Sequence, residues 1–207
     1  MDIEGNFWQH FPISRTILKV KMIFHKQKIS GVLVIEPQPY SDERGLLRRH
    51  FCRREFEENC IEMDLKQCNI SENKKRHTLR GFHYQLPPHG ENKILSCIKG
   101  AIFDVVLDLR ADSDSYMKWE SFELTEANRL SLYVPKGCAN AYLTLKDDTW
   151  IFYYHSEFYA PSAEVGIRYD DSVLGIKWPA APSVISEKDR SYPDFDGVRS
   201  LNNKRKA

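Results

Sequence analysis

The chain lacks several features that define common protein classes. No apolar run approaches the roughly 18 residues of a membrane span, and residues 1–21 contain no continuous apolar segment typical of a signal peptide. A net charge of +1 gives no electrostatic reason to expect nucleic acid or an acidic membrane as partner. There is no GxGxxG motif, no P-loop and no internal repeat. We therefore expect a globular protein that binds neither nucleic acid nor membrane.

Paired cysteines are also lacking. The chain has five cysteines, an odd number, and no CxxC motif. Free thiols in a reducing compartment account for this pattern best, so we expect a cytoplasmic protein without disulfides. A nucleophilic cysteine is the alternative, for which Cys68 and Cys138 are the candidates because they lie inside motifs described below.

The chain is long enough for one domain with tails. It has 207 residues, of which 42% are hydrophobic, and this suffices for a packed core. Met22 offers a second plausible start just before a strand-like segment. We predict an N-terminal extension over residues 1–21, a single domain over 22–190 and a polar tail over 191–207.

Short strand-like segments dominate the sequence. Residues 101–110 alternate with a period of two, which predicts a strand with Phe103, Val105 and Leu107 on one face, in a core. Residues 53–60 have a helical pattern. Many short strands with few helices predict an all-β antiparallel sandwich or barrel. The other predicted strands cover residues 32–37, 46–51, 65–71, 93–98, 119–124, 130–135, 141–145 and 149–155.

The segment TLRGFHYQ, residues 78–85, is also patterned like a strand but contains both Arg80 and His83. Strict alternation would place these two side chains on opposite faces. Both reach one pocket only if the strand is bent, and Gly81 between them is a natural position for a β-bulge. The simpler interpretation of His83 alone is a buried core histidine.

Two further segments supply side chains that suit the same pocket. A PPHG turn follows the His83 strand and would return the chain so that Lys93 lies alongside. The segment TWIFYYH brings Tyr153, although an aromatic core stripe is the simpler interpretation of that run. A histidine, a lysine and a tyrosine in one barrel mouth would form a proton-transfer site without a metal.

A metal site of the usual cupin kind is disfavoured. Such a site needs two or more closely spaced ligands, for example HxH with a carboxylate. The positions two before and two after His83 are Gly81 and Gln85, while His77 and His89 fall in predicted turns. We therefore predict no metal.

Many ordered motifs give the chain a specific family resemblance. From about Gly31 to Asp189 it resembles the dTDP-4-dehydrorhamnose 3,5-epimerases, sugar-nucleotide epimerases of the cupin superfamily. The resemblance implies a cupin-like β jelly roll with a few short helices, a homodimer and no cofactor. The motifs are DERG (42–45), QCNIS (67–71), LRGFHYQ (79–85), Lys93, GAIFDVVLDLR (100–110), PKGCAN (135–140), YYHSEFYAP (153–161), DDSVLGIKWP (170–179) and ISEKD (185–189).

The resemblance also implies roles for individual residues. It makes His83 the catalytic base and Asp189 the carboxylate that orients the imidazole. It places Lys93 at the ketone oxygen, where it stabilises the enolate, and makes Tyr153 the acid on the opposite face. The residues that it implies for substrate binding are Arg80, Asn69, Arg44, Gln67, Asn140, Tyr159 and Arg49.

These residue types fit the reaction of a 4-keto sugar. Protons on C3 and C5 are acidic because the carbanion delocalises onto the C4 oxygen. A histidine, with an unperturbed pKa near 6.5, removes such a proton at neutral pH when a positive charge holds the enolate. Inversion then needs a second proton donor on the other face, which a tyrosine supplies.

The chain departs from the family pattern at several pocket positions. Asn140 stands where the family has histidine, and asparagine cannot carry charge or move a proton. Leu47 and Arg49 replace an aromatic residue and a glutamate that contact the nucleotide, partly across the dimer. Cys68 stands where aspartate is common. The proton-transfer set is complete, whereas part of the binding set differs.

These observations predict an epimerase that inverts C3, C5 or both in a nucleotide-linked 4-keto-6-deoxy sugar. The nucleotide, which is dTDP, CDP or GDP, stays open. Two other classes remain as alternatives. One is a non-catalytic jelly roll that binds carbohydrate or sugar nucleotide, and the other is a metal-dependent cupin, which the missing ligands disfavour.

Overall fold

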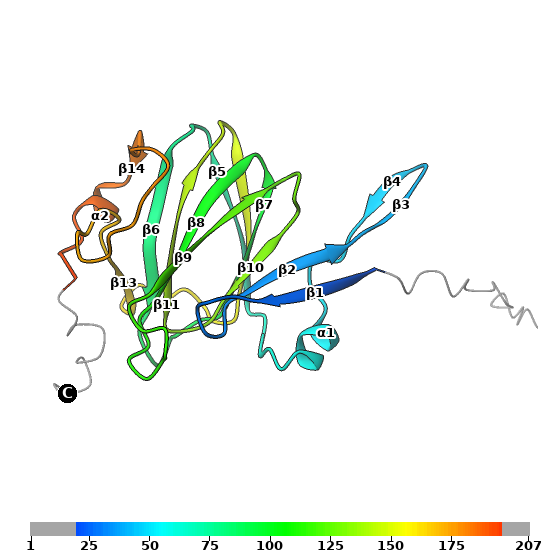
Figure 1. Cartoon of the computed structure of the whole chain (residues 1–207), viewed down its shortest axis with the longest axis horizontal. Helices are drawn as coiled ribbons and strands as arrows, with labels where there is room; N and C mark the ends of the chain where they lie inside the picture. The colour runs from blue at the N-terminus through cyan, green and yellow to red at the C-terminus, as the bar shows by residue number, and fades with distance from the viewer. Residues whose placement is uncertain (1–19, 196–207) are drawn as a thin grey trace, which may run out of the picture.

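Two β-sheets stacked face to face form the body of the protein (Figure 1). The computed structural model describes residues 20–195. The first sheet has the order β1 (Lys21–Lys26), β2 (Leu33–Gln38), β10 (Ser131–Val134), β7 (Lys93–Lys99), β12 (Thr149–His155) and β5 (Gln67–Asn73). The second has the order β13 (Glu164–Gly166), β6 (Thr78–Gln85), β11 (Cys138–Thr144), β8 (Ala101–Asp108) and β9 (Trp119–Thr125), and β14 (Val184–Ile185) pairs with β6.

Smaller elements complete the fold. The hairpin of β3 (Tyr40–Asp42) and β4 (Gly45–Leu47) projects away from the sheets, at the right of Figure 1. The helices are short, namely α1 (Arg53–Glu58) and α2 (Glu187–Arg190). This architecture is a cupin-like jelly roll with a few short helices, so the predicted fold class is confirmed.

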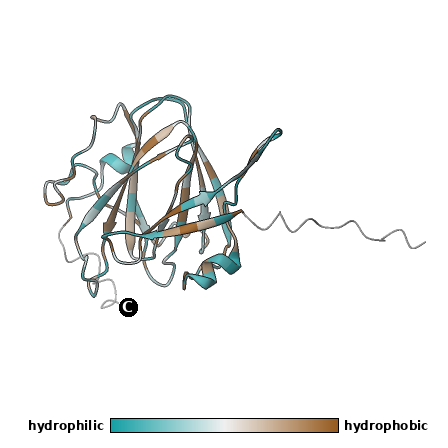
Figure 2. Cartoon of the chain, turned by 45° about the vertical axis from the view of Figure 1, so that its right-hand side comes forward, coloured by the Kyte–Doolittle hydropathy of each residue, from teal (hydrophilic) through white to brown (hydrophobic). Residues whose placement is uncertain are grey.

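The main core lies between the two sheets. Leu95 and Ile151 from the first sheet pack in one cluster with Ile102 and Val106 from the second, and all four side chains are fully buried. Figure 2 shows hydrophobic segments along the strands of the two sheets. Burial of such side chains contributes roughly 1.5–3 kcal/mol each, so this layer holds the sheets together.

Both sheets are also covered on their outer faces. Phe56 of α1 packs with Ile94 and Tyr133 against the first sheet. On the second sheet, Ile167 packs in a cluster with Val105. Strand β8 is therefore buried on both faces, and the prediction that residues 101–110 bury one face was wrong. The sequence pattern did not indicate that the second face is buried, because Asp104 and Asp108 lie on that face with Ile102 and Val106.

Most predicted elements are confirmed to within a few residues, including β6, β12 and α1. The prediction of a strand over residues 46–51 was wrong, because only Gly45–Leu47 is extended in a pair. Beyond it the side chains turn to other partners, since Arg49 pairs with Glu55 of α1 and His50 packs against Phe152. The elements that were not predicted are β1, β3, β13, β14 and α2, all short or weakly alternating.

The domain boundaries stay a prediction. Strand β1 begins at Lys21, one residue before the predicted domain start. Residues 1–19 and 196–207 lie outside the described residues. Within the predicted tail, Phe195 packs against the outer cluster of the second sheet, and Asp194 forms an ion pair with Arg168 at 3.0 Å. The start of the tail therefore contacts the domain.

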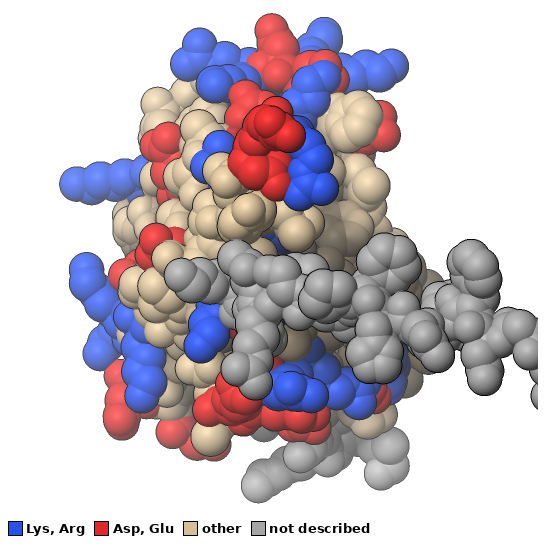
Figure 3. Space-filling view, turned by 90° about the vertical axis from the view of Figure 1, so that its right-hand side faces the viewer, with Lys and Arg blue, Asp and Glu red and all other residues tan. Residues whose placement is uncertain are grey.

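The surface carries charges of both signs. Figure 3 shows Lys and Arg side chains interspersed with Asp and Glu over one face of the molecule. No helix within residues 20–195 is long and apolar enough to cross a membrane.

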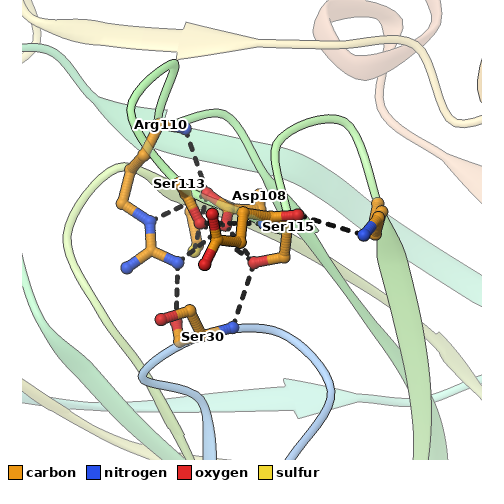
Figure 4. Close-up of polar contacts among 8 residues, drawn as sticks. Ser30, Asp108, Arg110, Ser113 and Ser115 are labelled. Atoms are coloured by element: carbon orange, nitrogen blue, oxygen red, sulfur yellow. Dashed lines mark hydrogen bonds and ion pairs between the residues drawn. The ribbon is translucent and has the colours of Figure 1, made fainter.

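A buried ionic network fixes the loop after β8 (Figure 4). Asp108 is fully buried and accepts hydrogen bonds from Arg110 Nε at 2.8 Å and from Ser113 and Ser115 at 2.6 Å. Arg110 also donates to the Ser30 carbonyl at 2.6 Å. Burial opposes ionisation of Asp108, but these donors outweigh it and hold its pKa far below the ordinary value.

Candidate active site

A cavity of about 270 Å³ opens between the two sheets. One wall comes from β6 and β11 of the second sheet, and the other from β5, β7 and β12 of the first. The side chains that line it include a high proportion of polar and ionisable groups, which suits a reaction site. They are Asn69, Ile70, Ser71, Arg80, His83, Tyr84, Gln85, Glu91, Lys93, Asn140, Tyr142, Tyr153, His155, Tyr159 and Glu164.

A β-bulge at Gly81 brings Arg80 and His83 to this cavity together. In the pairing of β6 with β11, Asn140 is opposite His83 and Tyr142 is opposite Arg80, so β6 has one extra residue. Gly81 has a φ of +108°, and a Cβ there would lie 2.6 Å from the Asn140 carbonyl oxygen. Only glycine fits this position. The predicted bulge is confirmed.

His83 forms a close pair with Asp189. The His83 Nε2 atom lies 2.7 Å from Asp189 Oδ1, and the Gly81 N–H donates to Asp189 Oδ2 at 3.2 Å. Ser186 caps α2 by accepting a hydrogen bond from the Asp189 N–H, which fixes the helix that carries the carboxylate. Residues 106 positions apart in the chain thus meet at one atom pair.

The charge on Asp189 determines which nitrogen of His83 is free. Burial acts to raise the pKa of Asp189, but the hydrogen bonds from His83 and Gly81 outweigh it and lower the pKa overall. An ionised carboxylate only accepts hydrogen bonds, so His83 Nε2 carries the proton of this pair. The Nδ1 atom then has a lone pair, and no partner for it occurs within residues 20–195.

The opposite wall has a cluster of three ionisable groups. Lys93 Nζ lies 3.0 Å from Glu91 Oε1, and His155 Nδ1 lies 2.8 Å from Glu91 Oε2. Lys93 Nζ also donates a long hydrogen bond of 3.4 Å to the His83 carbonyl, which links β7 of the first sheet to β6 of the second. The side chains of Lys93 and Glu91 are each 10% exposed.

Tyr153 lies beside this cluster on β12. Its ring stacks on His155 with 5.6 Å between centroids and 21° between planes. Burial, followed by the effects of Tyr142, raises the pKa of Tyr153 well above its ordinary value. The phenol is therefore a firmly protonated donor in the resting site.

Behind Asn140 lies a second buried carboxyl group, Asp104 of β8. The Asn140 Nδ2 atom donates to Asp104 Oδ2 at 3.0 Å, while Asp104 Oδ1 is buried without a partner among the described residues. Burial raises the pKa of Asp104 to about 8, although Asn140 and the charge of Lys93 act to lower it. Asp104 is therefore mostly neutral at pH 7.

The residues implied for substrate binding fall into two groups. Arg80, Asn69, Asn140 and Tyr159 line the cavity, and Arg80 is held by a 2.9 Å hydrogen bond to Asn73. The other three lie outside it. Gln67 accepts a 3.4 Å hydrogen bond from the Tyr159 N–H, Arg44 pairs with Asp42 in the projecting hairpin, and Arg49 pairs with Glu55.

Several pocket residues were not predicted from the sequence. Glu91 and His155 stand two positions from Lys93 and Tyr153, a spacing that puts side chains on one face of a strand and was the available signal. Glu164 accepts a 2.7 Å hydrogen bond from Tyr159, and Tyr192 packs its ring near His83. Neither has a local signature in the sequence.

The alternative sites receive no support from the geometry. Burial raises the pKa of Cys138 to about 12, and that of Cys68 also lies above its ordinary value. Neither thiol lines the cavity. Within residues 20–195, no group of three or more His, Cys, Asp or Glu side chains is arranged to hold a metal ion.

Comparison with known proteins decides the family. The sequence profile described as dTDP-4-dehydrorhamnose 3,5-epimerase matches residues 26–197. The chain belongs to this epimerase family. A relative from Sinorhizobium fredii with the same name is 38% identical over 176 residues, which cover 84% of this chain and 90% of the relative.

Solved structures of epimerases have the same fold. A dTDP-4-dehydrorhamnose 3,5-epimerase from Bacillus anthracis, solved with TDP and PPi bound, has a TM-score of 0.82 and 30% identity, covering 84% of this chain and all of that one. A 3'-monoepimerase from Streptomyces bikiniensis, in complex with dTDP-quinovose, has a TM-score of 0.77 and 32% identity, covering 82% and 86%. The resemblance in the motifs is confirmed, and the protein is an isomerase.

Proposed function

We propose that this protein inverts C3, C5 or both in a nucleotide-linked 4-keto-6-deoxy sugar, of the dTDP-4-dehydro-6-deoxyglucose type, without a cofactor. One observation carries the proposal. His83 on the second sheet, paired with Asp189 of α2, lines a single cavity with Lys93 and Tyr153 on the first sheet. A sugar between the walls has a base on one face and a proton donor on the other, which is what inversion requires.

In the proposed reaction, His83 takes the proton. Its free Nδ1 lone pair removes the hydrogen on the carbon next to the C4 ketone, and Asp189 stabilises the imidazolium that forms. The negative charge moves to the C4 oxygen. Lys93, held by Glu91 at the cavity wall, stabilises that oxygen electrostatically. Tyr153 then donates its hydroxyl proton to the carbon from the opposite face.

The size of the cavity supports a sugar ring as the enclosed part of the substrate. Its 270 Å³ lies near the lower limit of small-molecule pockets, which run from about 300 to 1,000 Å³. The nucleotide would then lie towards the mouth, where Arg80 offers a guanidinium to a phosphate. Solved members of the family hold TDP or a dTDP-sugar, and a nucleotide-linked sugar is the substrate class that we propose here.

A homodimer is part of the same proposal. The β3–β4 hairpin stands away from the body, and its Tyr40, Leu46 and Leu47 are exposed by 40%, 43% and 62%. A lone two-stranded hairpin is marginally stable in water, so packing against a second subunit would account for it. Arg44 and Arg49 would then serve the partner's substrate. Light scattering would test this, and a monomer at micromolar concentration contradicts it.

Proton NMR in deuterated water with dTDP-4-keto-6-deoxyglucose tests the activity. Deuterium at C3 and C5 with an inverted product identifies a 3,5-epimerase, and deuterium at one carbon identifies a monoepimerase. If no deuterium enters, the CDP- and GDP-linked sugars are tried next. Binding without exchange for all three would establish the binding-protein alternative and refute the proposed reaction.

A further inference from the structure

The cavity contains a second histidine–carboxylate pair, and its histidine has no part in the proposed reaction. His155 Nδ1 lies 2.8 Å from Glu91 Oε2, and the two side chains are 14% and 10% exposed. Both residues line the same cavity as His83 and Tyr153. His155 reaches it from β12 of the first sheet, so the two histidines belong to opposite walls.

Glu91 determines which atom of His155 is free. Burial acts to raise the pKa of Glu91, but His155 and Lys93 outweigh it, so the pKa is lowered and the carboxylate is ionised. His155 Nδ1 must therefore be the donor in this hydrogen bond. The Nε2 atom is left to bind or release a proton, and no partner for it occurs in the described part of the chain.

Tyr153 needs such a neighbour. Because its pKa is raised well above the ordinary value by burial, the tyrosinate left after proton donation is strongly disfavoured. His155 stacks directly on this ring, with 5.6 Å between centroids. Both side chains line the same cavity, and the relay inferred below runs through one water molecule or one substrate hydroxyl in it.

We propose that His155, oriented by Glu91, is a proton relay that restores Tyr153 after each delivery of a proton to carbon. The inference rests on the proposed epimerase function. Tyr153 gives its proton to carbon and becomes a tyrosinate, and the His155 imidazolium returns a proton to it from Nε2. His155 then takes one proton from water, while His83 releases to water the proton that it removed. After each inversion, the side chains of both walls have regained their starting protonation states.

The neighbouring groups are less suited to this task. Lys93 Nζ is engaged by Glu91 at 3.0 Å and by the His83 carbonyl at 3.4 Å, and in the proposed reaction it must keep its charge for the enolate. The hydroxyl of Tyr142 already pairs with Ser71 at 3.0 Å. A proton taken from this second phenol would also leave another tyrosinate to be restored.

A relay predicts that loss of His155 affects the steady-state rate much more than the single-turnover rate. With enzyme in excess, each active site turns over once and Tyr153 starts protonated, so His155→Ala keeps the single-turnover rate of the first inversion within about twofold of wild type. With substrate in excess, the steady-state inversion rate falls by about tenfold or more, since proton return becomes slow. Added imidazole raises the steady-state rate of His155→Ala.

Two matched variants serve as controls. His25→Ala removes a histidine that is also paired with a carboxylate, Glu36 at 2.9 Å, but lies on β1 outside the cavity, and it leaves both rates unchanged. His155→Gln retains an amide that can donate to Glu91 and tests the loss of the proton if His155→Ala folds poorly. Imidazole gives no increase in Tyr153→Phe, because that variant has no phenol to restore.

The outcomes distinguish a relay from a positioning role and from no role at all. A selective loss of the steady-state rate with imidazole rescue supports the relay. An equal fall in both rates without rescue means that His155 positions substrate, and unchanged rates mean that it is idle; either result overturns the relay. If the wild type itself exchanges no proton with any of the three nucleotide sugars, the proposed function fails and the relay fails with it.

Discussion

The two walls of the cavity hold similar groups in different settings. On the β6 wall, His83 pairs with Asp189, and Asp189 forms no ion pair with a lysine or arginine within residues 20–195. On the β7–β12 wall, Glu91 is shared between His155 and Lys93, and a tyrosine stacks beside them. The first arrangement suits removal of a proton, and the second suits holding positive charge and giving a proton back. The surroundings of each histidine, rather than the residue type, give the two walls their different proposed roles.

The largest effect should come from breaking the β6 wall at His83. The variant His83→Asn removes the base but keeps an amide that can pair with Asp189, so the fold should persist. We expect proton exchange at every sugar carbon to fall by about 10³-fold or more. Deuterium incorporation followed by NMR measures this, with circular dichroism as the check on folding. Appreciable residual turnover would remove His83 from the role of base.

Tyr153→Phe breaks the other wall and should separate the two proton steps. It deletes the donor hydroxyl but leaves the base, so inversion should fall by about 10²-fold while loss of the substrate proton falls less. Comparing the rate of deuterium wash-in with the rate of product formation measures the separation. If both rates fall equally, Tyr153 is not the acid, or its hydroxyl also orients the substrate.

Asp189→Asn removes the charged partner of His83 on the β6 wall. We expect turnover to fall by about tenfold to a hundredfold, since the imidazolium loses its counter-ion. The pH dependence of stability should also change. The pKa of Asp189 is lowered in the folded protein, so its contribution is present above the unfolded value near 3.9 and disappears as pH falls through the folded value.

Thermal unfolding between pH 2 and pH 7 tests that second expectation. Wild type should lose more stability than Asp189→Asn as the solution becomes acidic. Glu187→Gln, on the same short helix but exposed, is the matched control and should follow wild type. Parallel curves for wild type and Asp189→Asn would show that the pairing with His83 does not stabilise the fold.

The smallest effect on activity should come from Asp104, the neutral carboxyl behind the β6 wall. Its pKa of about 8 lies above the unfolded value near 3.9. The folded protein therefore holds a proton that the unfolded chain releases, and stability falls as pH rises between these values, by up to about 1.4 kcal/mol per pH unit. Asp104→Asn removes this dependence and should keep turnover within about threefold.

Melting temperatures at pH 5 and pH 8 check this expectation. The gain of Asp104→Asn over wild type should be larger at pH 8. Asp108→Asn is the contrasting variant, because that buried carboxylate has donors from Arg110, Ser113 and Ser115 and is charged, so its loss should destabilise the fold at both pH values. A gain that is the same at pH 5 and pH 8 would mean that Asp104 is ionised throughout.

Local pattern predicted the strands well where one face differs from the other. It failed at residues 46–51, where a strand-like run meets no partner strand beyond Leu47. It also mistook β8 for a strand with one buried face, because the covering residues, such as Ile167 and Leu174, come from a distant part of the chain. Periodicity reports the two sides of a strand and does not report what lies against each side.

The sequence by itself determined the family and the jelly-roll class, because ordered motifs and period-two alternation are local properties. The resemblance in those motifs also predicted His83, Lys93 and Tyr153 as site residues. Only the tertiary structure showed the contacts themselves. His83 meets the predicted Asp189 across 106 positions, and His155 meets Glu91, a pair that was not predicted, across 64. It also made Asp104 neutral and Asp189 charged. Burial and hydrogen-bond donors set the charge of a carboxyl group, and both arise only when distant segments pack together.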